Sequence, residues 1–179
     1  MDLTNLNKAC SKDSYPLPKI DKLVDATAGH TLLSFMDTFF GYHQIPLYPE
    51  DQEKTELNTD CGLHCYKMMP FELKNAGATY QHLVNKLFEP LIGQTMEVYI
   101  DNMIMKSETD RDHSCDLQKT FDILRVFNMK LNPKKCVFGV WSDKFLGFMI
   151  SSHDIKANAV KIQAVLDMKP PGIYERCRA

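Results

Sequence analysis

The sequence predicts an α+β fold with a split βαβ (ferredoxin-like) core, and three features support this. An apolar strand ends in Asp37, an apolar hairpin turns at Asp101-Asn102, and a helical pattern follows each of them. The order strand, helix, hairpin, helix, strand is that of a split βαβ unit. This layout places the end of the Asp37 strand beside the hairpin, although the two acids are far apart in sequence.

The composition is that of one globular domain. The chain has 179 residues, of which 44% are hydrophobic and 25% are charged. Its apolar runs are shorter than a membrane span, and its first residues lack the basic and apolar regions of a signal peptide. We therefore expect an intracellular protein (cytoplasmic or nuclear) without a membrane partner, whose six cysteines are reduced thiols.

A zinc site is a weaker interpretation of two groups of cysteine and histidine. Cys61, His64 and Cys65 lie close together, and His113 and Cys115 follow far downstream. A single residue between His113 and Cys115 is too short for the paired ligand spacing of structural zinc sites. The spacing therefore disfavours zinc.

The first half of the chain is expected to contain one helix and several strands. Residues 1–17 show no periodic pattern and are predicted to be irregular. A helix is expected to begin near Pro18, which suits a first helical turn, and to end at Gly29. Strands are then predicted at 32–37, 54–60 and 63–69.

The middle of the chain has the strongest helical patterns. Asn75 is predicted to cap a helix whose apolar face is formed by Tyr80, Leu83, Val84, Leu87 and Phe88. Strands over 95–100 and 103–106 form the predicted hairpin. The longest helix is predicted over 110–128, with a stripe formed by Leu117, Phe121, Leu124 and Asn128, and with Ile123 and Phe127 beside it.

The last part of the chain predicts two strands and a helix. The strands are expected at 135–140 and 144–150, and the helix at 158–168 with Asn158 as its cap. Its inward residues are predicted to be Ile162, Val165 and Leu166. From Pro170 onward the chain is expected to be irregular.

Asp37 and Asp101 are the residues with the clearest chemical interpretation. Two-metal phosphoryl transfer needs carboxylates that converge on divalent cations, and a strand end and a tight hairpin hold such groups rigidly. An Asp-Asn pair between apolar strands is also an ordinary turn, and an acid at a strand end can cap backbone amides. The residues alone leave both interpretations open.

Several segments in one order make the sequence similar to a known family. It resembles the reverse transcriptases of gypsy-type LTR retrotransposons, especially those of plant genomes. The resemblance implies a polymerase palm with part of the fingers over 1–171 and an unrelated tail over 172–179. The segments that carry it are DLTNLNKACSKDSYPLP (2–18), LLSFMDTFFGYHQI (32–45), MMPFELKNAGATYQHLVN (68–85), VYIDNMIMKS (98–107), MKLNPKKCVFGV (129–140) and KFLGFMIS (144–151).

The resemblance also implies a catalytic site for RNA-directed DNA synthesis. Asp37 and Asp101 match the metal-binding aspartates, and Asp101-Asn102 occupies the end of the family's Tyr-x-Asp-Asp box. The implied cofactors are two Mg²⁺ or Mn²⁺ ions, and the implied partners are an RNA/DNA template-primer and a dNTP. The residues implied for nucleotide binding are Tyr42, Phe71 and Lys74. Those implied for the primer grip are Phe145, Leu146 and Gly147.

The chain departs from the family pattern at two positions. Asn102 stands where the family has a second aspartate, so the site lacks one negative charge. Glu72 stands where the family has a glycine, which adds bulk and negative charge near a triphosphate site. The family also has finger strands, a thumb and RNase H parts that this sequence does not match. We therefore expect a polymerase fragment of impaired activity.

Two other interpretations remain beside this one. The first is a non-enzymatic remnant that binds nucleic acid or a protein through the palm surface, although the net charge of −2 does not favour autonomous nucleic-acid binding. The second is a degenerate copy that folds only in part, because surfaces that pack on fingers and thumb would be left exposed.

Overall fold

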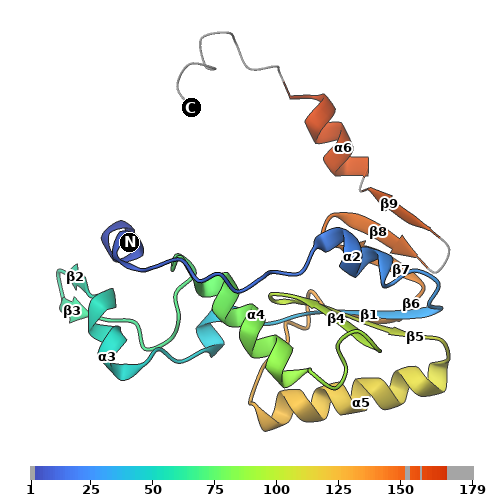
Figure 1. Cartoon of the computed structure of the whole chain (residues 1–179), viewed down its shortest axis with the longest axis horizontal. Coiled ribbons are helices and arrows are strands. Elements are labelled where there is room, and N and C mark those ends of the chain that lie inside the picture. Colours follow the sequence, from blue (N-terminus) through green and yellow to red (C-terminus); the bar gives the residue numbers. More distant parts are fainter. Residues whose placement is uncertain (1–2, 152–153, 158, 169–179) are drawn as a thin grey trace.

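A four-stranded antiparallel sheet in the order β4-β5-β1-β6 forms the centre of the fold. The computed structural model describes residues 3–151, 154–157 and 159–168. Helices α4 and α5 cover one face of the sheet, and α2 and a second sheet lie over the other (Figure 1). The bounds are β1 Leu32–Asp37, β4 Met96–Tyr99, β5 Asn102–Ser107, β6 Val137–Val140, α2 Ile20–Asp25, α4 Ala76–Leu87 and α5 Asp110–Val126.

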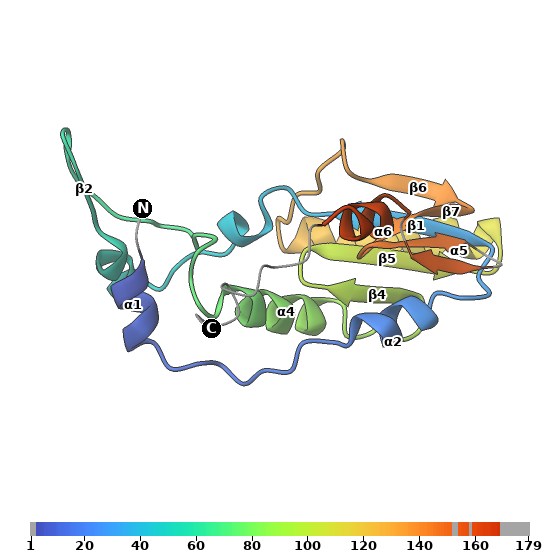
Figure 2. The same ribbon diagram turned by 90° about the horizontal axis from the view of Figure 1, so that it is seen from above.

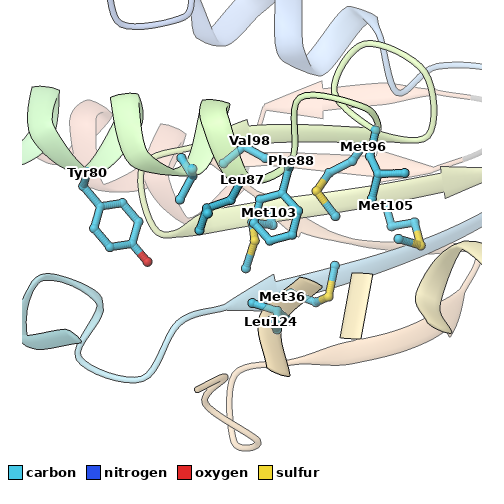
Figure 3. Close-up of a cluster of buried hydrophobic side chains, with 11 residues drawn as sticks. Met36, Tyr80, Leu87, Phe88, Met96, Val98, Met103, Met105 and Leu124 are labelled. Carbon is cyan, nitrogen blue, oxygen red and sulfur yellow. The ribbon is translucent and has the colours of Figure 1, made fainter. Parts of the chain in front are cut away.

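The two faces of the central sheet belong to different hydrophobic cores because side chains alternate along each strand. On β1, Leu33 and Phe35 pack with Val24 of α2, whereas Met36 packs beneath α4 and α5. Burying each such side chain contributes about 1.5–3 kcal/mol. The larger core, shown in Figure 3, consists of Met36, Tyr80, Val84, Leu87, Phe88, Leu91, Met96, Val98, Met103, Met105 and Leu124.

The second sheet has three antiparallel strands in the order β7-β8-β9: β7 Ser142–Phe145, β8 Phe148–Ser151 and β9 Ile155–Ala157. The prediction of one strand over 144–150 was wrong. Leu146 and Gly147 have positive φ of 49° and 94° and form a two-residue turn between β7 and β8. Such turns reverse the chain without splaying the strands. The strand β9 was not predicted.

The elements before and between these strands form the fingers end of the molecule, seen on the left in Figure 2. The prediction that residues 1–17 are irregular was wrong for residues 4–9, which form α1 directly after the buried Leu3, whereas residues 10–17 contain no helix or strand. The strands predicted at 54–60 and 63–69 are much shorter, and residues 54 and 55 are helical. The bounds are α1 Thr4–Ala9, η1 Gly41–Gln44, α3 Pro49–Gln52, η2 Glu53–Thr55, β2 Leu57–Thr59 and β3 Gly62–His64.

A buried ion pair links the palm strands to the end of α2. The Lys106 ammonium on β5 donates to Glu97 Oε1 on β4 at 2.8 Å and to the Ala26 carbonyl at 2.7 Å. Both charged side chains are buried. A buried charge is tolerated only when it is paired and hydrogen-bonded, so the three groups hold α2, β4 and β5 in one arrangement.

The predicted helices are confirmed in position but not in every detail. Asn75 stands before α4 but makes no side-chain cap hydrogen bond, and Phe127 is 54% exposed rather than packed. Helix α6 (Ala159–Leu166) was predicted to bury three apolar residues, but they are exposed: Ile162 by 48%, Val165 by 66% and Leu166 by 71%. The cap predicted at Asn158 and the tail from Pro170 lie outside the described residues.

No helix in the described part of the chain is long and apolar enough to cross a membrane. The two longest, α4 with 12 residues and α5 with 17, are also amphipathic, with polar residues on their outer faces. Each therefore packs one apolar side on the sheet, as helices of globular domains do.

Candidate active site

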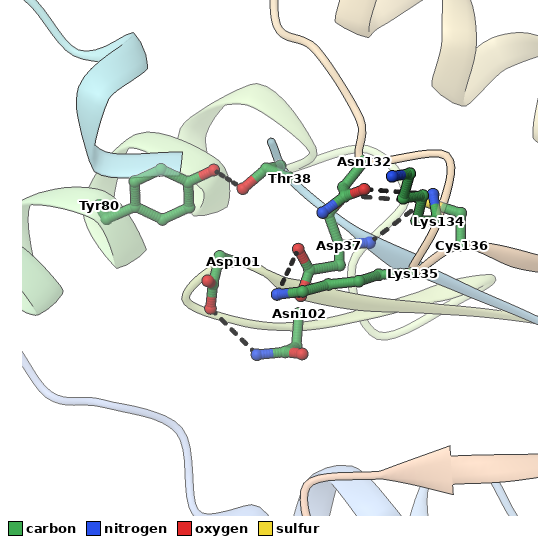
Figure 4. A network of polar contacts seen from close by, with 9 residues as sticks. All are labelled: Asp37, Thr38, Tyr80, Asp101, Asn102, Asn132, Lys134, Lys135 and Cys136. Carbon is green, nitrogen blue, oxygen red and sulfur yellow. Dashed lines mark hydrogen bonds and ion pairs between the residues drawn. The ribbon is translucent and has the colours of Figure 1, made fainter. Parts of the chain in front are cut away.

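Asp37 is the last residue of β1, and its backbone is fixed from both sides. It pairs with Asn102 across the sheet, its carbonyl accepts the Asn132 N–H at 2.8 Å, and its N–H donates to the Cys136 thiol at 3.4 Å. A strand end held in this way leaves the carboxylate little freedom. The side chain lies at the carboxyl end of β1, next to the tip of the hairpin between β4 and β5 (Figure 4).

Asp101 lies at the tip of that hairpin, one residue earlier in the turn than the sequence predicted. The pairing of Tyr99 with Asn102 leaves Ile100 and Asp101 as the two loop residues, so Asn102 already belongs to β5. Ile100 has a φ of 54°, which is strained for a β-branched residue.

A buried glutamine on α4 supports this strained turn. Gln81 Oε1 accepts the Ile100 N–H at 2.6 Å, while Gln81 Nε2 donates to the Val98 carbonyl at 3.3 Å. Opposite it, the Thr38 N–H donates to the Asp101 carbonyl at 3.2 Å. The hairpin tip is therefore fixed relative to both α4 and the end of β1.

The structure brings the two predicted carboxylates together in one electrostatic unit. Burial raises the pKa of Asp101, and the charge of Asp37 raises it further, whereas Lys135 acts in the opposite direction. The Lys135 ammonium lies 3.2 and 3.4 Å from the two Asp37 carboxylate oxygens (Figure 4). The Lys135 ammonium therefore balances part of the negative charge at this site.

Asn102 takes part in the same unit through its side chain. Its Nδ2 group donates to Asp101 Oδ1 at 3.0 Å, so the amide occupies one acceptor position of this carboxylate. The reverse orientation would set two oxygen atoms against each other. Asn102 therefore adds no charge and also uses a lone pair that a metal ion could use.

An aromatic group lies beside the carboxylates. Phe71 packs edge-on against Tyr42 with ring centres 5.3 Å apart and against His43 at 4.6 Å. Burial raises the pKa of the Tyr42 hydroxyl, and the charge of Asp101 adds to the effect. A cavity of about 290 Å³ opens next to this group. It is lined by Thr38, Phe39, Phe40, Gly41, Phe71, Asp101, Asn132 and Lys135.

Gly41 is required by the close packing beneath this cavity. A Cβ atom at Gly41 would lie 2.6 Å from Thr38 Oγ1 and 3.1 Å from the Tyr80 ring. Thr38 and Tyr80 share a buried hydrogen bond of 2.7 Å, so neither can move aside easily. The sequence analysis missed Gly41, Gln81 and Lys135, because their roles depend on contacts between distant segments.

Of the predicted site residues, Phe71 and Asp101 line this cavity. Asp37, Tyr42 and Asn102 contact residues of its lining, whereas the side chains of the remaining four lie elsewhere. Lys74 directs its ammonium to the Cys10 carbonyl at 2.8 Å and lines a different cavity of about 270 Å³. Phe145 is buried in the core against Phe35, with Leu146 packed beside it, and Gly147 has no side chain.

The donors present fit one divalent cation better than two. Asp37 and Asp101 supply two hard, mutually repelling carboxylates, which is the ligand type that Mg²⁺ and Mn²⁺ prefer. In the described part of the chain no three His, Cys, Asp or Glu side chains gather at one point. The third carboxylate that a second ion would need is replaced by the Asn102 amide.

The fold and the paired carboxylates define the palm of a template-directed polymerase. Comparison with known proteins gives the family: the sequence pattern of the reverse transcriptase (RNA-dependent DNA polymerase) family matches residues 1–150. The chain belongs to this family.

The similar curated proteins are polyproteins of LTR-type transposons. The chain is 32% identical over 179 residues to the retrovirus-related Pol polyprotein from transposon 297 of Drosophila melanogaster and 28% identical to that from transposon gypsy. It covers all of its own length but only 17% of each. The Tf2-7 polyprotein of Schizosaccharomyces pombe is 28% identical over 171 residues, with 13% covered. These relatives are from a fly and a yeast, so the likeness to plant elements stays a prediction.

Solved structures support the same fold. The foamy viral protease-reverse transcriptase in complex with RNA/DNA hybrid superposes with a TM-score of 0.83 at 20% identity, covering 95% of this chain and 23% of that one. The same protein in complex with dsDNA gives a TM-score of 0.85 at 20% identity, covering 97% and 36%. The predicted α+β polymerase palm is thereby confirmed.

Proposed function

We propose that this chain supplies the catalytic palm of an RNA-directed DNA polymerase and acts in template-directed nucleotidyl transfer. The observation that carries the proposal is the meeting of Asp37 and Asp101 from distant strands beside an aromatic-lined cavity. The proposed substrates are an RNA/DNA template-primer and a dNTP. The remaining fingers, the thumb and the RNase H part belong to the longer Pol polyprotein, and the location is inside the cell.

The proposed reaction joins the primer to the incoming nucleotide. The primer 3′-oxygen forms a bond to the α-phosphorus, the bond from this phosphorus to the bridging oxygen breaks, and pyrophosphate leaves with the electron pair. The hydroxyl proton passes to water. Asp37 and Asp101 would hold divalent Mg²⁺ or Mn²⁺ (two ions in the family pattern), which would supply stabilisation of the negative charge on these oxygens. The Lys135 ammonium contacts the Asp37 carboxylate at this position.

The aromatic group is proposed to bind the nucleotide. Tyr42 would lie beneath the sugar, and Phe71, which packs edge-on against Tyr42, lines the cavity. For Lys74 to bind the nucleotide, its ammonium would have to leave the Cys10 carbonyl, because its backbone N–H is also engaged, by Asn7. Phe145, Leu146 and Gly147 contribute to the primer grip through the backbone of their turn, because Phe145 is buried.

Two residues are proposed to impair this copy. Asn102 removes a carboxylate and donates a hydrogen bond to the remaining one. Glu72 adds a negative charge to the loop that carries Phe71. We also propose that residues 1–171 form the reverse transcriptase region and that 172–179 are an unrelated tail.

A primer-extension assay on poly-rA/oligo-dT with dTTP tests this proposal. We expect slow synthesis with Mn²⁺ that Asp101→Asn abolishes. The salt-dependent binding of an RNA/DNA hybrid is measured in parallel. Binding without any synthesis would contradict the catalytic proposal and favour a non-enzymatic binding module, and synthesis that persists in Asp101→Asn would remove the proposed site.

A further inference from the structure

The N-terminal segment, residues 3–15, crosses the loop that carries Phe71. We call residues 3–15 the strap and residues 70–75 the loop. Figure 2 shows the chain running from α1 at the fingers end towards α2 at the palm end. Leu3 anchors the start of the strap, because its side chain is only 6% exposed.

Asn7 holds the loop with both ends of its side-chain amide. Its Nδ2 group donates to the Glu72 carbonyl at 2.8 Å, and its Oδ1 atom accepts the Lys74 N–H at 2.8 Å. An asparagine side chain offers a donor and an acceptor in the same plane, as a peptide group does. Asn7 therefore satisfies two backbone groups of the loop as a neighbouring strand would.

Asn75 makes the reciprocal contact from the loop to the strap. Its Oδ1 atom accepts the Asp13 N–H at 3.0 Å, and its Nδ2 group donates to the Ser11 carbonyl at 2.9 Å. The Lys74 ammonium adds a bond of 2.8 Å to the Cys10 carbonyl. This explains why Asn75 does not cap α4: its side chain is already used.

The end of the strap is fixed to α4 independently. Tyr15 stacks on His82 with ring centres 4.8 Å apart, and its hydroxyl accepts the Asn85 amide at 2.8 Å. The strap is thus held before and after its contact with the loop. Because the strap is fixed at Leu3 and at Tyr15, the residues between them hold the loop in a defined place.

Residues 45–47, which follow Tyr42 and His43 in sequence, hold the chain just before the loop. The Met69 N–H donates to the Ile45 carbonyl at 2.8 Å, and the Leu47 N–H donates to the Lys67 carbonyl at 2.9 Å. Hydrogen bonds therefore hold the chain just before Phe71, at Met69, and just after it, at Glu72 and Lys74, and the Phe71 ring between them packs on Tyr42.

We propose that the strap is a positioning element for the nucleotide cavity and that Asn7 and Asn75 are positioning residues that set Phe71 against Tyr42. The expected effect on nucleotide binding rests on the proposed function, in which Phe71 lines the nucleotide cavity. It predicts that loss of the Asn7 contacts loosens the loop and weakens nucleotide binding without unfolding the palm.

Amide hydrogen exchange of the metal-free protein tests the contact itself. Asn7→Ala is expected to speed exchange of the Lys74 amide about 10-fold, whereas β1 and β5 exchange as before. Asn7→Asp keeps an acceptor for Lys74 but loses the donor for Glu72, so it keeps the protection of Lys74. Asn5→Ala, on the exposed side of the same helix, is the matched control. Equal exchange of Lys74 in Asn7→Ala and Asn5→Ala would overturn the proposal.

Binding of dTTP tests the consequence. It is measured by titration calorimetry with Mn²⁺ and a poly-rA/oligo-dT primer ended by a dideoxynucleotide, so that no synthesis occurs. We expect Asn7→Ala and Asn7→Asp to weaken dTTP binding about 3- to 10-fold and Asn5→Ala to leave it unchanged. Unchanged binding in both Asn7 variants would contradict the positioning role. If the unaltered chain binds no dTTP, the proposed function fails, and the exchange experiment alone decides whether the strap holds the loop.

Discussion

Asn102 differs from an aspartate by one amide group, and that group affects Asp101 in two ways. It removes a negative charge from the site, and its Nδ2 group takes one acceptor position of Asp101 at 3.0 Å. The second effect is a property of the folded structure, because it depends on the turn that sets these neighbouring side chains at one hairpin tip.

We expect Asn102→Asp to raise the rate of primer extension with Mn²⁺ about 10-fold or more, because it restores a charge that stabilises the bound cation. Asn102→Ala is the matched control, since it frees Asp101 without restoring charge. The rates are compared on poly-rA/oligo-dT. Equal rates for the two variants would show that the hydrogen bond, and not the missing charge, limits this copy.

The residues of the site differ in how far the sequence could predict them. Local pattern made Asp37 and Asp101 candidates, because they stand at a strand end and a hairpin, but only the family resemblance favoured a catalytic role over an ordinary turn. Lys135 meets Asp37 across 98 positions of sequence, and no local pattern indicates such a contact. Lys74 was assigned to nucleotide binding by resemblance. Its ammonium instead donates to the Cys10 carbonyl of the strap. Local pattern predicted no regular structure for that segment and gave no sign of this contact.

At the scale of elements, apolar periodicity placed the strands of the palm but missed how turns divide them. The segment 144–150 shows a continuous strand pattern, yet Leu146 and Gly147 reverse the chain within it. Likewise, α6 shows apolar periodicity, but Ile162, Val165 and Leu166 are exposed. Periodicity reports which face of an element is apolar, whereas turns and packing partners depend on backbone dihedrals and on distant segments.

His113 joins α5 to three strands of the central sheet. The Ser34 hydroxyl of β1 accepts the Gly139 N–H of β6 at 3.0 Å and shares a hydrogen bond with His113 Nε2 at 2.6 Å. His113 Nδ1 shares a second hydrogen bond, of 2.9 Å, with the Ser107 hydroxyl of β5. Burial lowers the pKa of this imidazole, and the nearby carboxylates of Asp116 and Asp110 oppose the effect only in part. The neutral ring is therefore the form that fits.

This arrangement predicts that acid destabilises the fold. Because the folded-state pKa of His113 lies below the unfolded value of about 6.5, the unfolded chain binds the proton first as the pH falls. The free energy of unfolding should fall below about pH 6.5, by at most about 1.4 kcal/mol per pH unit from this group. Urea unfolding at several pH values measures it, with His113→Gln as the comparison. An identical pH dependence in both proteins would contradict this role.

At the scale of the molecule, the described residues form a palm whose hydrophobic cores contrast with the exposed helix α6. It spans 17% of its first curated relatives, and α6 leaves the sheet with its apolar side chains exposed (Figure 1). The hydrophobic cores, by contrast, lie between residues that the described chain itself supplies. Stability therefore comes from the palm, and α6 adds little to it.

We expect deletion of residues 158–179 to change the melting temperature by less than about 2 °C, because the removed apolar side chains of α6 bury little surface. Circular dichroism of the full and shortened chains measures this. A large fall in melting temperature would mean that α6 packs on the palm in solution. Leu124→Ala, which removes a buried core side chain, is the comparison that should lower it clearly.

The pairing of Asp37 with Asp101 is the feature on which the whole molecule's proposed activity depends. Titration with Mn²⁺, followed by electron paramagnetic resonance of the free ion, measures this pairing without requiring catalysis. We predict that the unaltered chain binds Mn²⁺ and that Asp37→Asn and Asp101→Asn each weaken its binding about 10-fold or more. Binding that is the same in all three proteins would contradict a shared cation site.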